Sequence, residues 1–164
     1  MAESPLIEKR SKCARRAAFF LRGLAIGYFI AACYVITLYL TFSPGTYSNI
    51  FRLLIAMIIA MIVIPGWVIA AKLLTIAKRI LKQEDTAPRD AKAILISVGI
   101  VCSLPLAALG ASFLNHALFL FFHRELDKPL YAAAFFLFLI LLLHGLAFLA
   151  VRDVARSNHS APKV

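Results

Sequence analysis

Four long apolar segments, separated by loops that are alternately poor and rich in Lys and Arg, constrain this 164-residue chain most strongly. A helix needs about 20 apolar residues to cross a hydrocarbon core of roughly 30 Å, and each segment is long enough to do so. The sequence therefore predicts an all-α integral membrane protein with four transmembrane helices. The predicted spans are 17–42, 53–76 with an amphipathic extension to 82, 93–122 and 130–151.

The composition excludes a soluble globular domain. Hydrophobic residues make up 62% of the chain and charged residues 16%, whereas ordinary globular domains are roughly 45 to 50% apolar. Outside the apolar segments there remain a basic tail over 1–16, three loops and a C-terminal tail over 152–164. None of these is long enough to form a hydrophobic core of its own. We therefore expect a single membrane domain over 1–164.

The distribution of Lys and Arg predicts how the chain is oriented. The N-terminal part up to Arg22 carries six, the second loop six and the C-terminal tail three, whereas the first and third loops together carry three. Four spans place fifteen basic residues on one side of the membrane and three on the other. Because cytoplasmic loops are enriched in Lys and Arg, both termini are expected in the cytoplasm. Short loops join antiparallel neighbours, so we expect an antiparallel four-helix bundle in the cell inner membrane.

The same distribution explains the net charge of +10. The bias between loops accounts for the whole excess, so no nucleic-acid partner is expected. Juxtamembrane cations are attracted instead to the anionic lipids of the inner leaflet. The amphipathic extension over 72–82 is either a lipid-docking surface of this kind or the way a basic loop leaves the membrane. The predicted anionic-lipid contacts are Arg15, Arg16, Lys78, Arg79 and Lys82.

Small residues recur at intervals of four in three of the apolar segments, and the row in the second segment is short, with only Ala56 and Ala60. Such rows let two helix backbones approach closely in lipid, where van der Waals contact supplies the packing energy. We expect these rows to pack against other helices of this chain or of a partner. The predicted helix-packing residues are Gly23, Gly27 and Ala31 in the first segment and Gly99, Ser103, Ala107 and Ala111 in the third.

Three polar side chains inside the apolar segments, Asn115, His116 and His144, are candidates for chemistry. At roughly 1.5 Å per residue, His116 lies about 10 Å and His144 roughly 20 Å below the outer surface. These two imidazoles differ too much in depth to ligate one ion, and no metal or other cofactor is expected. Hydrogen bonds to neighbouring helices are expected instead. A polar path along the three side chains is the alternative.

Other motifs indicate no catalytic centre. The chain has no Gly-rich phosphate loop, no Ser/His/Asp arrangement and no paired carboxylates, so no enzymatic activity is expected. Cys13, Cys33 and Cys102 lie in the cytoplasmic tail or within helices, and no disulfide is predicted. Pro65 and Pro105 interrupt the second and third segments. The sequence leaves open whether they are static kinks or hinges.

Three classes of function are compatible with these features. The leading hypothesis is a non-enzymatic membrane interaction protein: an accessory subunit, an assembly factor or an inhibitor of another membrane component. It would recognise a membrane-protein partner, or a second copy of itself, through small-residue helix faces and the basic cytoplasmic surface. The alternative is a small oligomeric transporter or channel with its polar path at Asn115, His116 and His144. The third hypothesis is a histidine-ligated redox carrier.

Overall fold

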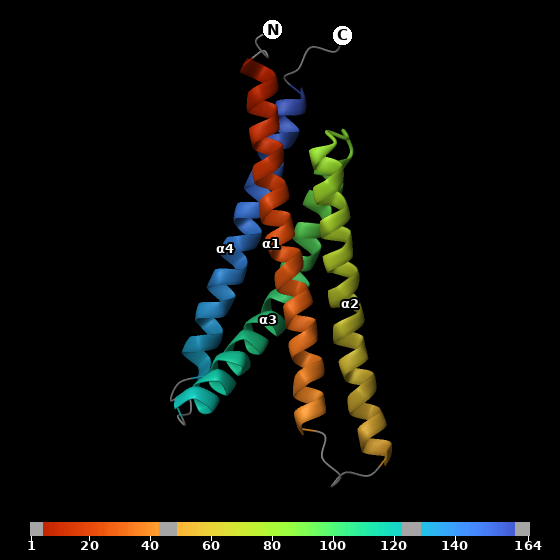
Figure 1. Ribbon diagram of the computed structural model, residues 1–164, viewed down its shortest axis with the longest axis vertical. Coiled ribbons are helices and arrows are strands. Elements are labelled where there is room, and N and C mark those ends of the chain that lie inside the picture. The colour runs from red at the N-terminus through yellow and green to blue at the C-terminus, as the bar shows by residue number, and fades with distance from the viewer. Residues whose placement is uncertain (1–4, 43–48, 123–128, 160–164) are drawn as a thin grey trace.

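The computed structural model describes residues 5–42, 49–122 and 129–159. Outside the turn at 82–86, these residues form four helices, each with a stretch long and apolar enough to cross a membrane. For the described part of the chain, the prediction of an all-α protein with four such helices is confirmed. The helices are α1 (Pro5–Phe42), α2 (Asn49–Leu81), α3 (Ala87–Phe122) and α4 (Pro129–His159) (Figure 1).

At the basic end the helices extend beyond their apolar segments. α1 begins at Pro5 rather than at residue 17, so most of the expected N-terminal tail is helical. Lys, Arg, Glu and Ala all have favourable helix propensities. Lys12 also pairs with Glu8 one turn earlier, with 2.6 Å between Nζ and Oε1. Because Ala14 on this stretch is buried, the basic segment belongs to the packed part of the protein.

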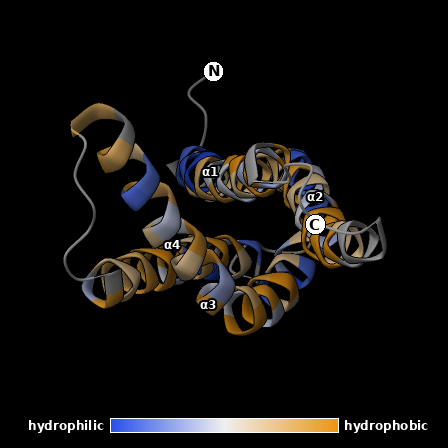
Figure 2. Cartoon of the chain, turned by 90° about the horizontal axis from the view of Figure 1, so that it is seen from below, coloured by the Kyte–Doolittle hydropathy of each residue, from blue (hydrophilic) through white to orange (hydrophobic). Residues whose placement is uncertain are grey.

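The helices pair as two antiparallel hairpins. α1 packs mainly against α2, and α3 mainly against α4, whereas α2 and α3 contact each other little. The hairpins meet at the end of the molecule where both termini lie, and they diverge away from it (Figure 1 and Figure 2). In an evenly packed bundle each helix would contact its neighbours along its whole length. In this structure the contacts between the hairpins are concentrated at one end.

The main core lies at this shared end, and all four helices contribute to it. It includes residues 14–28 of α1, 70–80 of α2, 87–95 of α3 and 147–154 of α4. Many of its members are alanines, which add little width and let helix backbones approach closely. This core therefore holds the two hairpins together. Its largest fully buried side chains are Leu21, Leu73, Ile80 and Val151.

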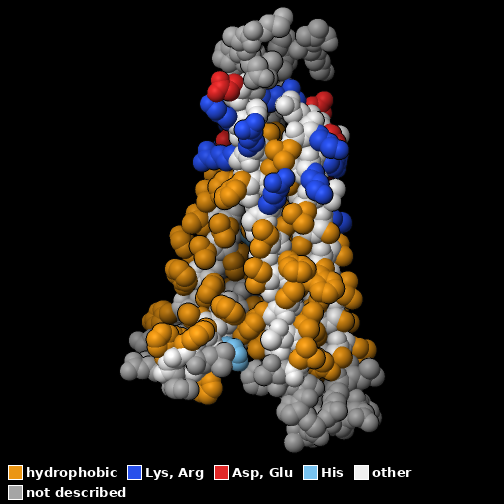
Figure 3. All heavy atoms as spheres, in the orientation of Figure 1, with side chains coloured by type: hydrophobic (Ala, Val, Ile, Leu, Met, Phe, Trp, Pro, Cys, Tyr) orange, Lys and Arg blue, Asp and Glu red, His pale blue; other side chains and the backbone are white. Residues whose placement is uncertain are grey.

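Most of the apolar surface points outwards. Between 17% and 28% of the residues in each candidate span are buried within the chain, and large side chains such as Ile100 and Leu130 are more than 70% exposed. Apolar side chains cover the visible face except near the shared end, where Lys and Arg gather (Figure 3). Helices that are apolar on all sides are typical of a lipid environment. The outward faces are therefore suited to lipid contact.

A Schellman turn connects α2 to α3. Gln83 adopts a left-handed backbone conformation with φ of 62°. Its N–H donates to the Ile80 carbonyl (3.0 Å), and the Glu84 N–H donates to the Arg79 carbonyl (3.2 Å). These bonds satisfy carbonyls that the end of α2 would otherwise leave unpaired. The chain can therefore reverse direction within the five residues 82–86.

Pro65 and Pro105 lie inside α2 and α3, and both helices continue through them. Next to Pro65, a Cβ built on Gly66 would lie 3.5 Å from the Ala32 Cβ of α1. Both prolines line a cavity of about 260 Å³ between α1, α2 and α3. The two interruptions noted in the sequence thus face the same space between the hairpins.

Candidate functional site

A larger cavity of about 290 Å³ lies between α1, α3 and α4, where the hairpins begin to diverge. We call it the cleft. One wall is the small-residue row of α1, with Gly23 and Gly27. The opposite wall is formed by α3 and α4 and carries the aromatic rings of Phe113 and Phe136. The cleft is not fully enclosed, so a molecule could enter it from outside.

The α1 wall contains the predicted helix-packing residues of the first segment. A Cβ built on Gly23 or on Gly27 would meet nothing within 4 Å, and both glycines are exposed. α1 instead buries a different face, on which Ala18, Ala25 and Ala32 are 1% to 4% exposed. These alanines recur every seven residues, which is the interval that returns a helix to nearly the same side. α1 therefore leaves Gly23 and Gly27 of the predicted packing row uncovered, whereas Ala31 is partly buried.

The small-residue row of α3 is buried. Ser103, Ala107 and Ala111 are 3% to 8% exposed, and Gly99 is buried as well. A Cβ built on Gly99 would lie 3.5 Å from Cδ2 of His144. The small residue at this position therefore lets the α4 imidazole lie close to the α3 backbone.

His144 forms a hydrogen bond between helices. Its Nδ1 lies 2.8 Å from the Ile140 carbonyl oxygen, and its Nε2 lies 3.0 Å from the Tyr28 hydroxyl. A carbonyl can only accept, so we assign the ring proton to Nδ1 and the hydroxyl proton to the bond with Nε2. An imidazolium charge would be costly among apolar helix faces, so we assign the neutral form, which uses both of its nitrogens in these contacts. This is the kind of interhelical bond that the sequence led us to expect for His144.

Sequence reasoning did not single out Tyr28. The predicted polar residues were the histidines and Asn115, and Tyr28 was counted among the apolar residues of the first span. The sequence does offer one indication of this contact, which is the distance of each residue along its helix from the basic end. Tyr28 lies six residues beyond Arg22, and His144 lies eight residues before Arg152. The two side chains therefore sit at similar levels of antiparallel helices.

The three residues of the predicted polar path lie at two separate levels. His144 packs against Gly99, whereas Asn115 follows Gly99 by sixteen residues along α3. At roughly 1.5 Å per residue this separation is about 24 Å. Asn115 and the adjacent His116 are both partly buried. The structure therefore does not bring the three side chains into one cluster.

The described side chains that could bind a metal ion or react as thiols are also spread over several helices. Among the described residues, no three His, Cys, Asp or Glu side chains lie close enough to hold a metal ion. Cys13, Cys33 and Cys102 are free thiols, each partly buried. His123, which shares a face with His116 in the sequence, lies outside the described residues.

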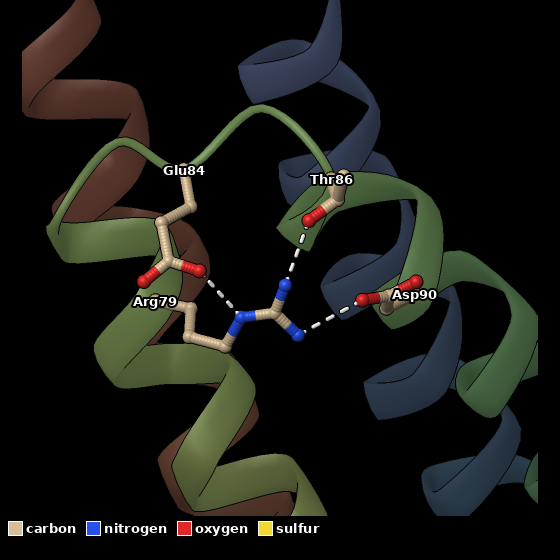
Figure 4. A network of polar contacts seen from close by, with 4 residues as sticks. All are labelled: Arg79, Glu84, Thr86 and Asp90. Atoms are coloured by element: carbon tan, nitrogen blue, oxygen red, sulfur yellow. Dashed lines mark hydrogen bonds and ion pairs between the residues drawn. The ribbon is translucent and has the colours of Figure 1, made fainter.

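The predicted anionic-lipid residues divide into two groups. Arg15, Arg16, Lys78 and Lys82 are exposed, and they lie on or beside the helix stretches that form the core at the shared end, where Lys and Arg side chains gather (Figure 3). Arg79 is instead engaged within its own turn (Figure 4): Nε donates to Glu84 (2.6 Å), Nη1 to Asp90 (2.9 Å) and Nη2 to Thr86 (2.7 Å). All three guanidinium nitrogens are used. A lipid contact at Arg79 would have to compete with these bonds, which bridge α2 to the start of α3.

These features define the class of the protein. Four helices long and apolar enough to span a membrane make the chain a multi-pass membrane protein. Comparison with protein-family models, with curated proteins and with solved structures finds no match.

Proposed function

We propose that this is a non-enzymatic interaction protein of the cell inner membrane that binds another membrane component in the cleft. An accessory, assembly or inhibitory role would be exerted through that contact. The observation that carries this proposal is the uncovered α1 wall at Gly23 and Gly27, where an added Cβ would meet nothing within 4 Å. Small-residue faces permit the close approach on which association in lipid depends.

The opposite wall supports the same conclusion. The Phe113 side chain lines the cleft and is 54% exposed, with its ring edge-on to that of Tyr34 at a centroid distance of 5.2 Å. Aromatic rings held in this way offer a large contact area at a low cost in conformational entropy. The cleft thus has one wall of small residues on α1 and one wall with aromatic rings on α3 and α4.

The basic end supports the proposed orientation. Arg15, Arg16, Lys78 and Lys82 are exposed there, and none of them has an ion-pair partner among the described residues. Anionic headgroups of the cytoplasmic leaflet would supply the missing counter-charges. With this end in the inner leaflet, both termini are cytoplasmic and the cleft opens into the lipid beyond the headgroups.

Site-specific photocrosslinking in native membranes tests the proposal. A photoreactive phenylalanine derivative at Phe113 reports on the cleft, and the same residue at Phe138, which is 65% exposed and lies outside the cleft, serves as the control. We expect discrete adducts at position 113 that the cleft-filling substitution Gly27→Leu suppresses. Identical adducts at the two positions, or adducts that Gly27→Leu leaves unchanged, would show that the cleft is not the interaction site.

A further inference from the structure

Tyr28 and His144, the hydrogen-bonded pair that lines the cleft, can form one further hydrogen bond, as an acceptor. In the tautomer assigned above, Nδ1 of His144 donates to the Ile140 carbonyl oxygen, and the Tyr28 hydroxyl donates to Nε2. A hydroxyl oxygen can also accept hydrogen bonds, and no donor from the described residues is bonded to Tyr28 Oη. A polar group entering the cleft can therefore bond to this pair only if it is itself a donor.

The depth of the pair excludes a charged ligand group. Tyr28 lies six residues beyond Arg22, the last cation of α1, which is about 9 Å at roughly 1.5 Å per residue. His144 lies about 12 Å beyond Arg152 by the same rise. A phosphate at this depth would leave the headgroup region for hydrocarbon, which is costly for any charge. The group that reaches Tyr28 is therefore a neutral donor.

The remaining lining suits an apolar body. Apart from the pair and the Tyr34 hydroxyl, which lies 3.5 Å from Ser112 Oγ, the cleft is walled by aliphatic and aromatic side chains and by the bare backbone at Gly23 and Gly27. Its volume of about 290 Å³ lies just below the usual range for small-molecule sites, about 300 to 1,000 Å³. The open side lets a chain longer than the cleft continue into the surrounding lipid.

We propose that the cleft binds a neutral membrane alcohol, whose hydroxyl donates a hydrogen bond to Tyr28 Oη and whose apolar chain lies between the α1 wall and Phe113. This inference rests on the proposed function, because it specifies the membrane component that the cleft receives. A ketone, an ester or an ether of the same shape lacks the donor and binds more weakly.

Photolabelling of the purified full-length protein tests this inference. The probe is a photoreactive analogue of farnesol, and the competitors are farnesol, farnesyl methyl ether and a diacylglycerol. Farnesol is expected to compete about tenfold better than its methyl ether, which corresponds to about 1.4 kcal/mol for one hydrogen bond. If the diacylglycerol competes as well as farnesol, glycerides are one source of the alcohol. If it competes no better than the ether, the source is restricted to single-chain alcohols.

Three variants locate the site. Gly27→Leu fills the cleft and is expected to abolish labelling. Gly145→Leu is its matched control, because a Cβ at Gly145 also meets nothing within 4 Å but this residue lies outside the cleft. Tyr28→Phe is expected to reduce competition by farnesol to the level of the ether. Equal competition by farnesol and ether in the unaltered protein, or full labelling of Gly27→Leu, would overturn the inference.

The two proposals can fail separately. If position 113 crosslinks a discrete component in native membranes but neither farnesol nor the diacylglycerol competes better than the ether, the alcohol is wrong and the interaction site stands. If position 113 gives no discrete adduct and the alcohols do not compete, both proposals are wrong.

Discussion

The Tyr28 hydroxyl and His144 Nε2 lie 3.0 Å apart and join α1 to α4 across 116 positions of sequence. Both side chains are more than nine-tenths buried, and their rings meet edge-on at a centroid distance of 6.0 Å. They lie where the apolar core ends and the cleft begins. The pair therefore ties the two hairpins together at the level from which they diverge.

Removing this bond should cost stability. We expect Tyr28→Phe to lower the free energy of unfolding by about 1 kcal/mol, because it leaves His144 Nε2 buried without a donor. The double variant Tyr28→Phe with His144→Leu should lose less than the sum of the single losses, since neither partner is then left unpaired. Thermal unfolding in mild detergent measures all three. Strictly additive losses would show that the two side chains do not interact.

Two glycines of α3 should respond differently to the same substitution. A Cβ on Gly110 would lie 2.6 Å from Cγ and Cδ1 of Phe136, whereas a Cβ on Gly99 meets His144 at an ordinary 3.5 Å. We expect Gly110→Ala to destabilise the protein by about 1 to 3 kcal/mol through overpacking. Gly99→Ala, its matched control, should be close to neutral in the same unfolding assay. A reversed order would contradict the packing of α3 against α4.

The three-way contact of Arg79 should depend on the guanidinium shape rather than on charge alone. Lysine keeps the charge but presents a single ammonium group, which cannot serve three partners in fixed directions. We expect Arg79→Lys to loosen the turn at 82–86, seen as faster amide hydrogen exchange and faster proteolysis there. Lys78→Gln, one residue away and exposed, is the control and should leave both rates unchanged.

Anionic lipid should bind to the exposed cations and not to Arg79. We expect Arg15→Gln with Arg16→Gln to reduce the number of phosphatidylglycerol molecules retained in native mass spectrometry. The effect should shrink as ionic strength rises, because salt screens exposed charges. Arg79→Gln should retain as much lipid as the unaltered protein, since its nitrogens are already engaged. Loss of lipid in Arg79→Gln equal to that in the double variant would contradict this division.

The charge bias makes a topological prediction. A phosphatase that is active only in the periplasm should be inactive when fused after residue 164 and active when inserted in the loop at 43–48. The reason is that fifteen of the eighteen Lys and Arg residues lie on the predicted cytoplasmic side. The opposite pattern of activity would invert the orientation and move the basic surface away from the inner leaflet.

The four helices themselves could be predicted from the sequence. A long apolar run must satisfy its backbone groups internally in lipid, and a helix does so within one segment. The helical state of the basic stretch before residue 17 was missed because its charge suggested a solvated tail. The small-residue rows were visible in the sequence, but only the row from Gly99 to Ala111 is buried, whereas Gly23 and Gly27 face open space.

What the sequence by itself determined was the number of helices and the location of charge, because both follow from the run of residue types along the chain. The tertiary structure decided which face of each helix is covered. Tyr28 meets His144, and the α1 wall stays open, only because α1 is rotated to bury Ala18, Ala25 and Ala32 instead. That rotation could not be predicted, since a helix apolar on every side carries little amphipathic signal for its inward face.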